Sequence, residues 1–112
     1  MQNINISNLG CVIYTKSKTG IEAEWLFTSN GKLEKGTGIG KRISQNNFEN
    51  EFEGDYEIIY IDSEGKSSPK IDLKITKQTD YFELIWSFQG EISEVGIGIE
   101  KDEKLIVSWK KI

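Results

Sequence analysis

The chain has 112 residues, a formal net charge of −4 and 37% hydrophobic residues, which indicates one globular domain over 1–112 and excludes a disordered chain. It contains no histidine and a single cysteine, Cys11, which excludes imidazole chemistry, an intrachain disulfide and a cysteine-based zinc site. A single arginine, the acidic balance and the lack of an apolar run of about 20 residues predict a protein with no nucleic-acid or membrane partner.

The composition favours strands over helices. Isoleucine outnumbers leucine by 17 to 6, and the chain has one alanine and 11 glycines. Isoleucine is β-branched and fits a pleated strand, whereas alanine and leucine are the strongest helix formers. We therefore predict an all-β protein.

Apolar and polar residues alternate through most of the chain, as they do in strands with one buried face. In chain order, this pattern predicts strands at 10–17, 20–29, 32–42, 54–62, 68–77, 80–89, 91–100 and 104–111. Short turns rich in Gly, Asn and Asp join most of these strands, so neighbours along the chain pair antiparallel. Eight strands connected in this way predict an up-and-down (meander) β-barrel.

The connection at 43–53 is the longest link between predicted strands. Ser44 is expected to cap one helical turn, which would place Phe48 and Phe52 on one side. The segment is interpreted either as a lid over a ligand opening, with Trp25, Tyr56 or Trp109 beneath it, or as a permanent plug of one barrel end.

An internal repeat relates 10–42 to 71–100. Trp25 and Phe27 match Trp86 and Phe88 at one offset, and Gly38-Ile39-Gly40 matches Gly96-Ile97-Gly98. We infer that matching positions share a face and that both tryptophans lie inside. The same reasoning predicts outward-facing glycines and inward-facing side chains at Leu33, Ile39, Phe88, Val95, Ile97 and Ile99.

The motif Gly54-Asp55-Tyr56, the eight meander strands and the aromatic interior resemble the avidin and lipocalin (calycin-type) group of small β-barrels. The length is nearer to that of an avidin. The Trp, Gly-Ile-Gly and Trp pattern of 86–109 is also similar to that of small uncharacterised bacterial β-barrel proteins. The resemblance implies a ligand-binding barrel, but it does not extend to the polar residues that contact biotin in avidins.

No arrangement of residues in the sequence predicts catalysis, a metal site or a cofactor. The run Gly36–Lys41 lacks the spacing of a phosphate-binding loop, and no helix pattern follows it. The acidic alternation at 49–57 matches no calcium loop and is interpreted as a solvated strand edge. Cys11 has no histidine to activate it as a nucleophile. We therefore expect that the protein is not an enzyme, with no catalytic residue, metal or cofactor.

Aromatic residues on the inner face form the candidate ligand site. Indole and phenol groups can line an opening at a barrel end and orient an apolar ligand. The alternative is that they only fill the core. The candidate ligand-binding residues, including those of the 43–53 connection, are Trp25, Tyr56, Trp86, Trp109, Asn46, Asn47, Phe48 and Phe52.

The outer face carries a second candidate site. Ile13, Leu26 and Ile106 point outward on the first, second and last predicted strands, which are neighbours in a closed barrel. Such an apolar patch predicts an interface, and we expect a homodimer.

Two functions follow from these patterns. The first is a non-enzymatic binding barrel that takes a small apolar or aromatic ligand at one end. The second is a protein-interaction module, such as a regulator, an inhibitor or an immunity-type protein, which uses its outer sheet and the 43–53 loop. The segment MQNINISNLG lacks the charged and apolar regions of a secretory signal, and one thiol suits a reducing compartment, so we expect a cytoplasmic location.

Overall fold

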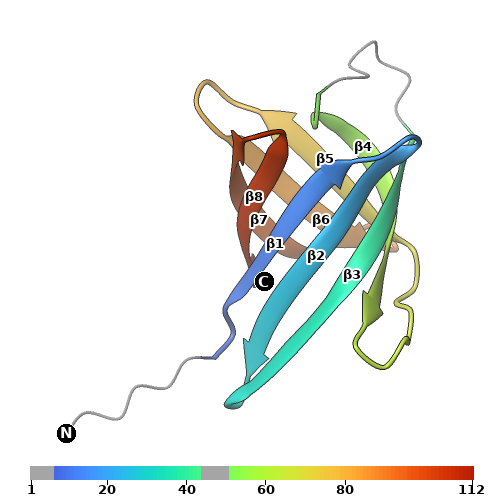
Figure 1. Cartoon of the computed structure of the whole chain (residues 1–112), viewed down its shortest axis with the longest axis vertical. Helices are drawn as coiled ribbons and strands as arrows, with labels where there is room; N and C mark the ends of the chain where they lie inside the picture. The colour runs from blue at the N-terminus through green and yellow to red at the C-terminus, as the bar shows by residue number, and fades with distance from the viewer. Residues whose placement is uncertain (1–6, 44–50) are drawn as a thin grey trace, which may run out of the picture.

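A computed structural model describes residues 7–43 and 51–112 (Figure 1). The described residues contain no helix and form a closed antiparallel barrel with the strand order β1-β2-β3-β4-β5-β6-β7-β8. The predicted all-β up-and-down barrel is therefore confirmed. The strands are β1 (Gly10–Lys16), β2 (Gly20–Ser29), β3 (Lys32–Arg42), β4 (Gly54–Asp62), β5 (Ile71–Lys77), β6 (Phe82–Phe88), β7 (Glu91–Lys101) and β8 (Lys104–Lys111).

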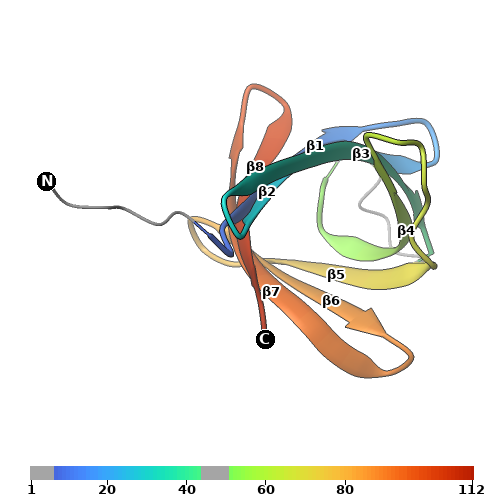
Figure 2. The same ribbon diagram turned by 90° about the horizontal axis from the view of Figure 1, so that it is seen from below.

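Pairing between the first and last strands closes the barrel. β1 pairs with β2 on one edge and with β8 on the other, so that Ile13 lies opposite both Glu24 and Ile106. Odd-numbered strands run from the lower end of the barrel in Figure 1 to the upper end, and even-numbered strands run back. The β2–β3, β4–β5 and β6–β7 connections therefore share the lower end, which faces the viewer in Figure 2.

The predicted strand boundaries agree with the structure at most positions. The clearest difference is β5, which begins at Ile71 instead of residue 68. Pro69 has no N–H to give to the ladder, and Ser68 uses its hydroxyl oxygen to accept a hydrogen bond from the Tyr60 N–H at 2.9 Å. The chain therefore joins the ladder two residues after the proline.

The upper half of the barrel is filled by side chains. Phe52, Tyr56 and Tyr14 are fully buried there, together with aliphatic residues of β2, β4, β5, β6 and β8. Phe52 lies just before β4 and closes this end from inside, with the Lys16 Nζ 4.9 Å from the centre of its ring. An eight-stranded barrel is narrow enough for its own side chains to fill it, and the upper half follows that rule.

The predicted orientation of β3 and β7 is wrong. Ile39 and Ile97 are each 58% exposed, Leu33 and Ile99 are also exposed, and Val95 lies opposite the outward-facing Ile85. The glycines of β3 and β7 face inward instead. A Cβ at Gly36 would lie 2.6 Å from Trp25 Cζ2, and one at Gly96 would lie 3.1 Å from Trp86 Cη2. The two indoles fit inside because the strand beside each one presents no side chain there.

Phe88 also departs from its predicted burial. The register of β6 and β7 shifts between Trp86 and Ser87, and beyond this bulge the side chain of Phe88 is exposed. A bulge turns the following residues away from the regular ladder. The repeat therefore relates Trp25 to Trp86, but it does not carry the burial of Phe27 over to Phe88.

Candidate functional site

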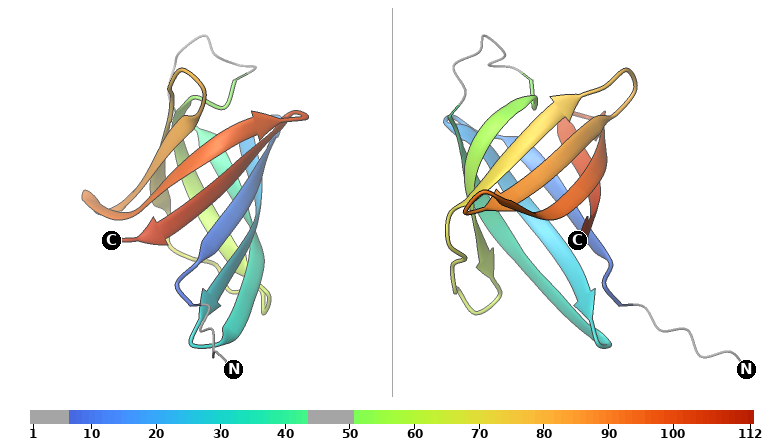
Figure 3. Two further views of the ribbon diagram at one scale, coloured as in Figure 1. Left: turned by 90° about the vertical axis from the view of Figure 1, so that its left-hand side faces the viewer. Right: turned by 180° about the vertical axis from the view of Figure 1, so that it is seen from behind.

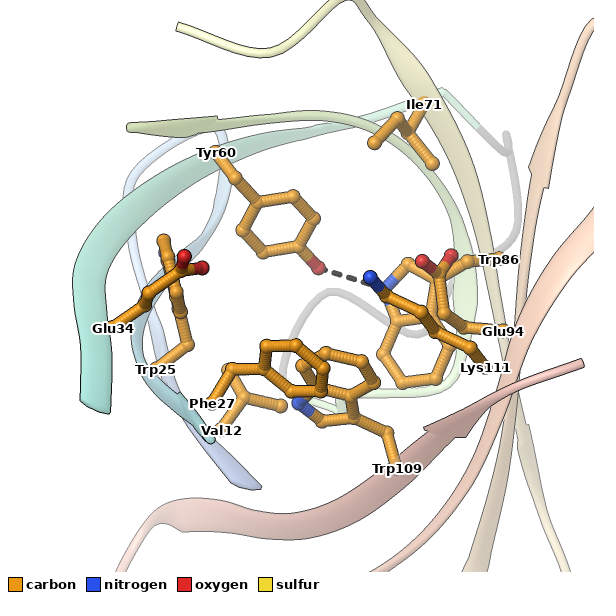
Figure 4. Close-up of a pocket in the computed structure, with 10 residues that line it drawn as sticks. All are labelled: Val12, Trp25, Phe27, Glu34, Tyr60, Ile71, Trp86, Glu94, Trp109 and Lys111. Atoms are coloured by element: carbon orange, nitrogen blue, oxygen red, sulfur yellow. Dashed lines mark hydrogen bonds between the residues drawn. The ribbon is translucent and has the colours of Figure 1, made fainter. Parts of the chain in front are cut away.

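A pocket of about 210 Å³ lies in the lower half of the barrel (Figure 4). Five of its lining residues are aromatic, two are aliphatic and three are charged: Val12, Trp25, Phe27, Glu34, Tyr60, Ile71, Trp86, Glu94, Trp109 and Lys111. Most of these residues lie near the ends of even-numbered strands or the starts of odd-numbered strands. The up-and-down topology therefore brings them to one end of the barrel.

Stacked aromatic rings form one wall of the pocket. The Phe27 and Trp109 rings are 5.0 Å apart between centroids and 17° from parallel, within the range for offset stacking. The Lys111 Nζ lies 4.7 Å from the Phe27 ring centre. A cation over a ring is attracted by the negative face of the π-system, so Lys111 and Trp109 together restrict the motion of Phe27.

The indole of Trp25 lies on β2, on another side of the same space. Its Nε1–H donates to the Thr37 carbonyl on β3 at 2.9 Å. This bond crosses over Gly36, where a side chain would collide with the ring. Half-buried and fixed in this way, the Trp25 ring presents an apolar surface to the pocket.

A hydrogen-bonded cluster of Tyr14, Tyr60 and Trp86 separates the pocket from the filled half. The Trp86 Nε1–H donates to the Tyr60 hydroxyl oxygen at 2.7 Å, and the Tyr60 and Tyr14 hydroxyl oxygens are 2.6 Å apart. Tyr14 is fully buried, whereas Tyr60 is partly exposed and lines the pocket. Figure 4 shows the Tyr60 hydroxyl directed into the middle of the pocket.

Burial keeps both hydroxyls of this cluster protonated. Loss of solvent raises the pKa of Tyr14 well above its ordinary value, and proximity to Tyr60 raises it further. Burial likewise raises the pKa of Tyr60, although hydrogen bonds from Tyr14 and Trp86 offset part of the effect. Near neutral pH, the Tyr60 hydroxyl is therefore a neutral donor and acceptor.

Two carboxylates and one ammonium group also line the pocket. Glu34 and Lys111 are exposed, whereas Glu94 is half-buried and accepts a hydrogen bond from the Ser93 hydroxyl. The three formal charges sum to −1. Since like charges repel more strongly where water is partly excluded, this lining disfavours an anion in the pocket.

The predicted ligand-binding residues fall into three groups. Trp25, Trp86 and Trp109 line the pocket together. Tyr56 and Phe52 do not, because both are fully buried at the upper end, where the Tyr56 hydroxyl donates to the Phe52 carbonyl at 2.7 Å. The remaining three, Asn46, Asn47 and Phe48, lie outside the described residues, as does the predicted Ser44 cap.

The upper end is tied to the barrel by Arg42. Its guanidinium donates to the Glu53 carbonyl at 2.6 Å, to the Tyr56 hydroxyl at 2.7 Å and to the Glu51 carbonyl. Burial raises the pKa of Tyr56, although Arg42 lowers it in part. These bonds hold 51–53 against β3 and β4, at the end opposite the pocket, so no lid over Trp25 or Trp109 can come from these residues.

The residues missed as site residues are Val12, Phe27, Tyr60, Ile71 and the three charged residues of the lining. The strand direction could have identified some of them. Phe27 and Tyr60, like the predicted Trp25, Trp86 and Trp109, lie in the second half of even-numbered strands, and such positions meet at one end of a meander barrel. Glu34, Glu94 and Lys111 have no such pattern, since charged residues near strand ends are common on any barrel.

The predicted interface residues lie on neighbouring strands of the outer face, which Figure 3 (left) views from the side of β7, β8 and β1. Ile13 pairs directly with Ile106, and Ile106 pairs with Ile99 on β7. Leu26 lies in the adjacent row opposite Cys11. Together with Ile97, these side chains form an exposed apolar surface, called the isoleucine face below, that consists of Ile13, Leu26, Ile97, Ile99 and Ile106.

Comparisons with protein-family models, curated proteins and solved structures found no match for this chain. The resemblance to avidins and lipocalins therefore stays a prediction. Within 7–43 and 51–112, no group of three or more acidic or cysteine side chains could hold a metal ion. The same residues include no helix of the length and apolarity needed to cross a membrane.

Proposed function

We propose that the protein is a non-enzymatic binding barrel that takes one small apolar or aromatic molecule in the pocket at its lower end. The aromatic lining carries this proposal. Trp25, Phe27, Tyr60, Trp86 and Trp109 converge from four strands on one space, although the other half of the same barrel is filled. Aromatic side chains converging on a concave site with few polar groups are typical of small-molecule sites.

The volume limits the ligand to about one aromatic ring. Sites for drug-sized molecules usually measure about 300–1,000 Å³, whereas this pocket measures about 210 Å³. An apolar cavity of about 150 Å³ accepts benzene. We therefore expect binding of substituted benzenes and weaker binding of larger ring systems.

Calorimetric titration with isopropylbenzene tests this function. The Ile71→Trp variant places an indole in the pocket and is expected to abolish binding. The matched Ile97→Trp variant makes the same change on the outer face and is expected to bind as the original chain does. Equal binding by both variants would place the ligand outside the pocket, and no binding by the original chain would contradict the function.

The isoleucine face supports a second candidate function, a protein-interaction module that includes self-association into a homodimer. Ile97 and Ile99 enlarge the predicted Ile13, Leu26 and Ile106 set, and all five side chains are exposed. A contiguous apolar patch of this kind is uncommon on a monomer without a partner. Light scattering that shows a dimer for the original chain and a monomer for Ile106→Lys would support this function. A monomer at high concentration would contradict the homodimer.

We also propose a cytoplasmic location, because a free thiol at the exposed Cys11 suits a reducing compartment. Fractionation of the native host is the direct test. Recovery of the protein in the cytoplasmic fraction would support the proposal, and recovery outside the cell would contradict it.

A further inference from the structure

We propose that the pocket selects an aromatic ligand carrying a neutral hydrogen-bond acceptor, such as a carbonyl oxygen, which receives the hydroxyl proton of Tyr60. This inference rests on the proposed binding function and adds the chemical class of the ligand. It follows from a count of donors in the cluster of Tyr14, Tyr60 and Trp86.

The cluster contains more hydrogen-bond donors than hydrogen bonds between its members. The Trp86 indole N–H and the two hydroxyls supply three donors, whereas the structure contains two contacts, at 2.7 and 2.6 Å. The indole proton occupies the first contact. One of the two hydroxyl protons occupies the second, and the other has no acceptor within the cluster.

The difference in burial assigns the remaining proton. Tyr14 is fully buried, and the Tyr60 hydroxyl is its hydrogen-bond partner. A buried donor without an acceptor is costly, so Tyr14 donates to Tyr60. Tyr60 then accepts two bonds, from Trp86 and Tyr14, and its own proton is directed into the pocket that its ring lines. No acceptor of the described residues bonds to this proton.

The charges of the pocket decide which acceptor is favoured. A carboxylate on the ligand would meet the negative charges of Glu34 and Glu94, which Lys111 offsets only in part. A carbonyl or ether oxygen accepts the Tyr60 proton without this repulsion. Because the raised pKa of Tyr60 keeps its hydroxyl protonated, the donor is present throughout the neutral range.

Three probes of the same number of non-hydrogen atoms test the inference: isopropylbenzene, acetophenone and benzoate. The first lacks an acceptor, the second has a neutral one and the third has a charged one. We expect the original chain to bind acetophenone about three- to ten-fold more tightly than isopropylbenzene, the usual range for one neutral hydrogen bond. Benzoate is expected to bind most weakly.

Three tyrosine variants identify the donor. Tyr60→Phe is expected to remove the preference for acetophenone while it still binds isopropylbenzene. Tyr14→Phe is expected to keep the preference, because Tyr60 retains its own proton. Tyr81→Phe changes an exposed tyrosine and serves as the matched control, with the preference unchanged.

The possible outcomes separate this inference from the function on which it rests. Equal binding of acetophenone and isopropylbenzene by the original chain would overturn the inference and leave the apolar pocket intact. A preference that appears only in Tyr14→Phe would show that Tyr60 donates to Tyr14, which also overturns it. Benzoate binding as tight as that of acetophenone would overturn the requirement for a neutral acceptor. No binding of any probe would contradict the proposed function itself.

Discussion

Replacing Gly36 with alanine tests the orientation of β3, on which the shape of the pocket depends. A Cβ at this position would lie 2.0 Å from the Ile61 carbonyl oxygen and 2.6 Å from Trp25 Cζ2, whereas an ordinary contact measures 3.4–4 Å. The Ile61 oxygen belongs to the backbone of β4, so a change of rotamer cannot relieve the collision. β3 and β4 must instead move apart, and the Trp25 ring must shift as well.

Overpacking of this kind usually costs about 1–3 kcal/mol. We expect Gly36→Ala to fall in the upper half of that range, because one of the two collisions is with backbone. Urea denaturation followed by circular dichroism gives the free energy of unfolding by linear extrapolation. Thr37→Ser is the control, since this residue is exposed on the opposite face of β3, and its effect should stay within about 0.5 kcal/mol. A Gly36→Ala cost no larger than that of Thr37→Ser would refute the inward orientation of Gly36.

Three further predictions concern the tryptophans, the closed end and the tyrosines. Trp86→Ala should lower the free energy of unfolding by about 3–5 kcal/mol, as for other buried aromatics, and Trp25→Ala should cost less because Trp25 is half-buried; equal losses in urea denaturation would contradict the difference. Phe52→Ser should also lower the free energy of unfolding by several kcal/mol. It should not change the affinity for isopropylbenzene, because Phe52 lies at the end opposite the pocket. A large loss of affinity in calorimetry would instead support the interpretation of 43–53 as a lid. The free energy of unfolding should fall above pH 10. Burial raises the pKa of three tyrosines above 10.0, namely Tyr14, Tyr56 and Tyr60. Above that pH, the unfolded chain therefore loses hydroxyl protons that the folded chain keeps. Each tyrosine contributes up to about 1.4 kcal/mol per pH unit, so stability unchanged between pH 10 and 11 in urea denaturation would refute this burial.

Most of the barrel could be predicted because local patterns determine it. The alternation in β2 and β6 identifies an inward face, and the tight turns allow only antiparallel neighbours. β3 and β7 were misjudged because the pattern identifies a buried face by its large apolar side chains. At Gly36 and Gly96 the inner face carries no side chain, whereas Ile39 and Ile97 on the same strands are exposed on the outer surface. The indoles of Trp25 and Trp86 need space that the neighbouring strands must leave free, and this need decides which face of β3 and β7 turns inward. Such a tertiary requirement is not visible in the sequence of one strand.

The candidate site could be predicted only in part. Three tryptophans were expected at a ligand site, and all three line the pocket. One of the two interpretations of the 43–53 connection was a lid with Trp25, Tyr56 or Trp109 beneath it, whereas Phe52 lies at the upper end with Tyr56, away from the two tryptophans of the pocket. Counting strand directions would have shown this, because 43–53 joins the upper ends of β3 and β4. The Tyr14–Tyr60 bond could not have been foreseen, since it joins residues 46 positions apart on strands that are not paired.

The lower half of the barrel is proposed to bind a small aromatic molecule inside it. The most direct measurement follows the indole and backbone N–H signals in a nitrogen–proton correlation spectrum during titration with acetophenone. We predict saturable shifts of the Trp25, Trp86 and Trp109 indole signals, while the amides of Phe52 and Ile97 stay in place. Shifts confined to Ile97 and its neighbours on the isoleucine face, or no saturable shift of any indole signal, would contradict the claim.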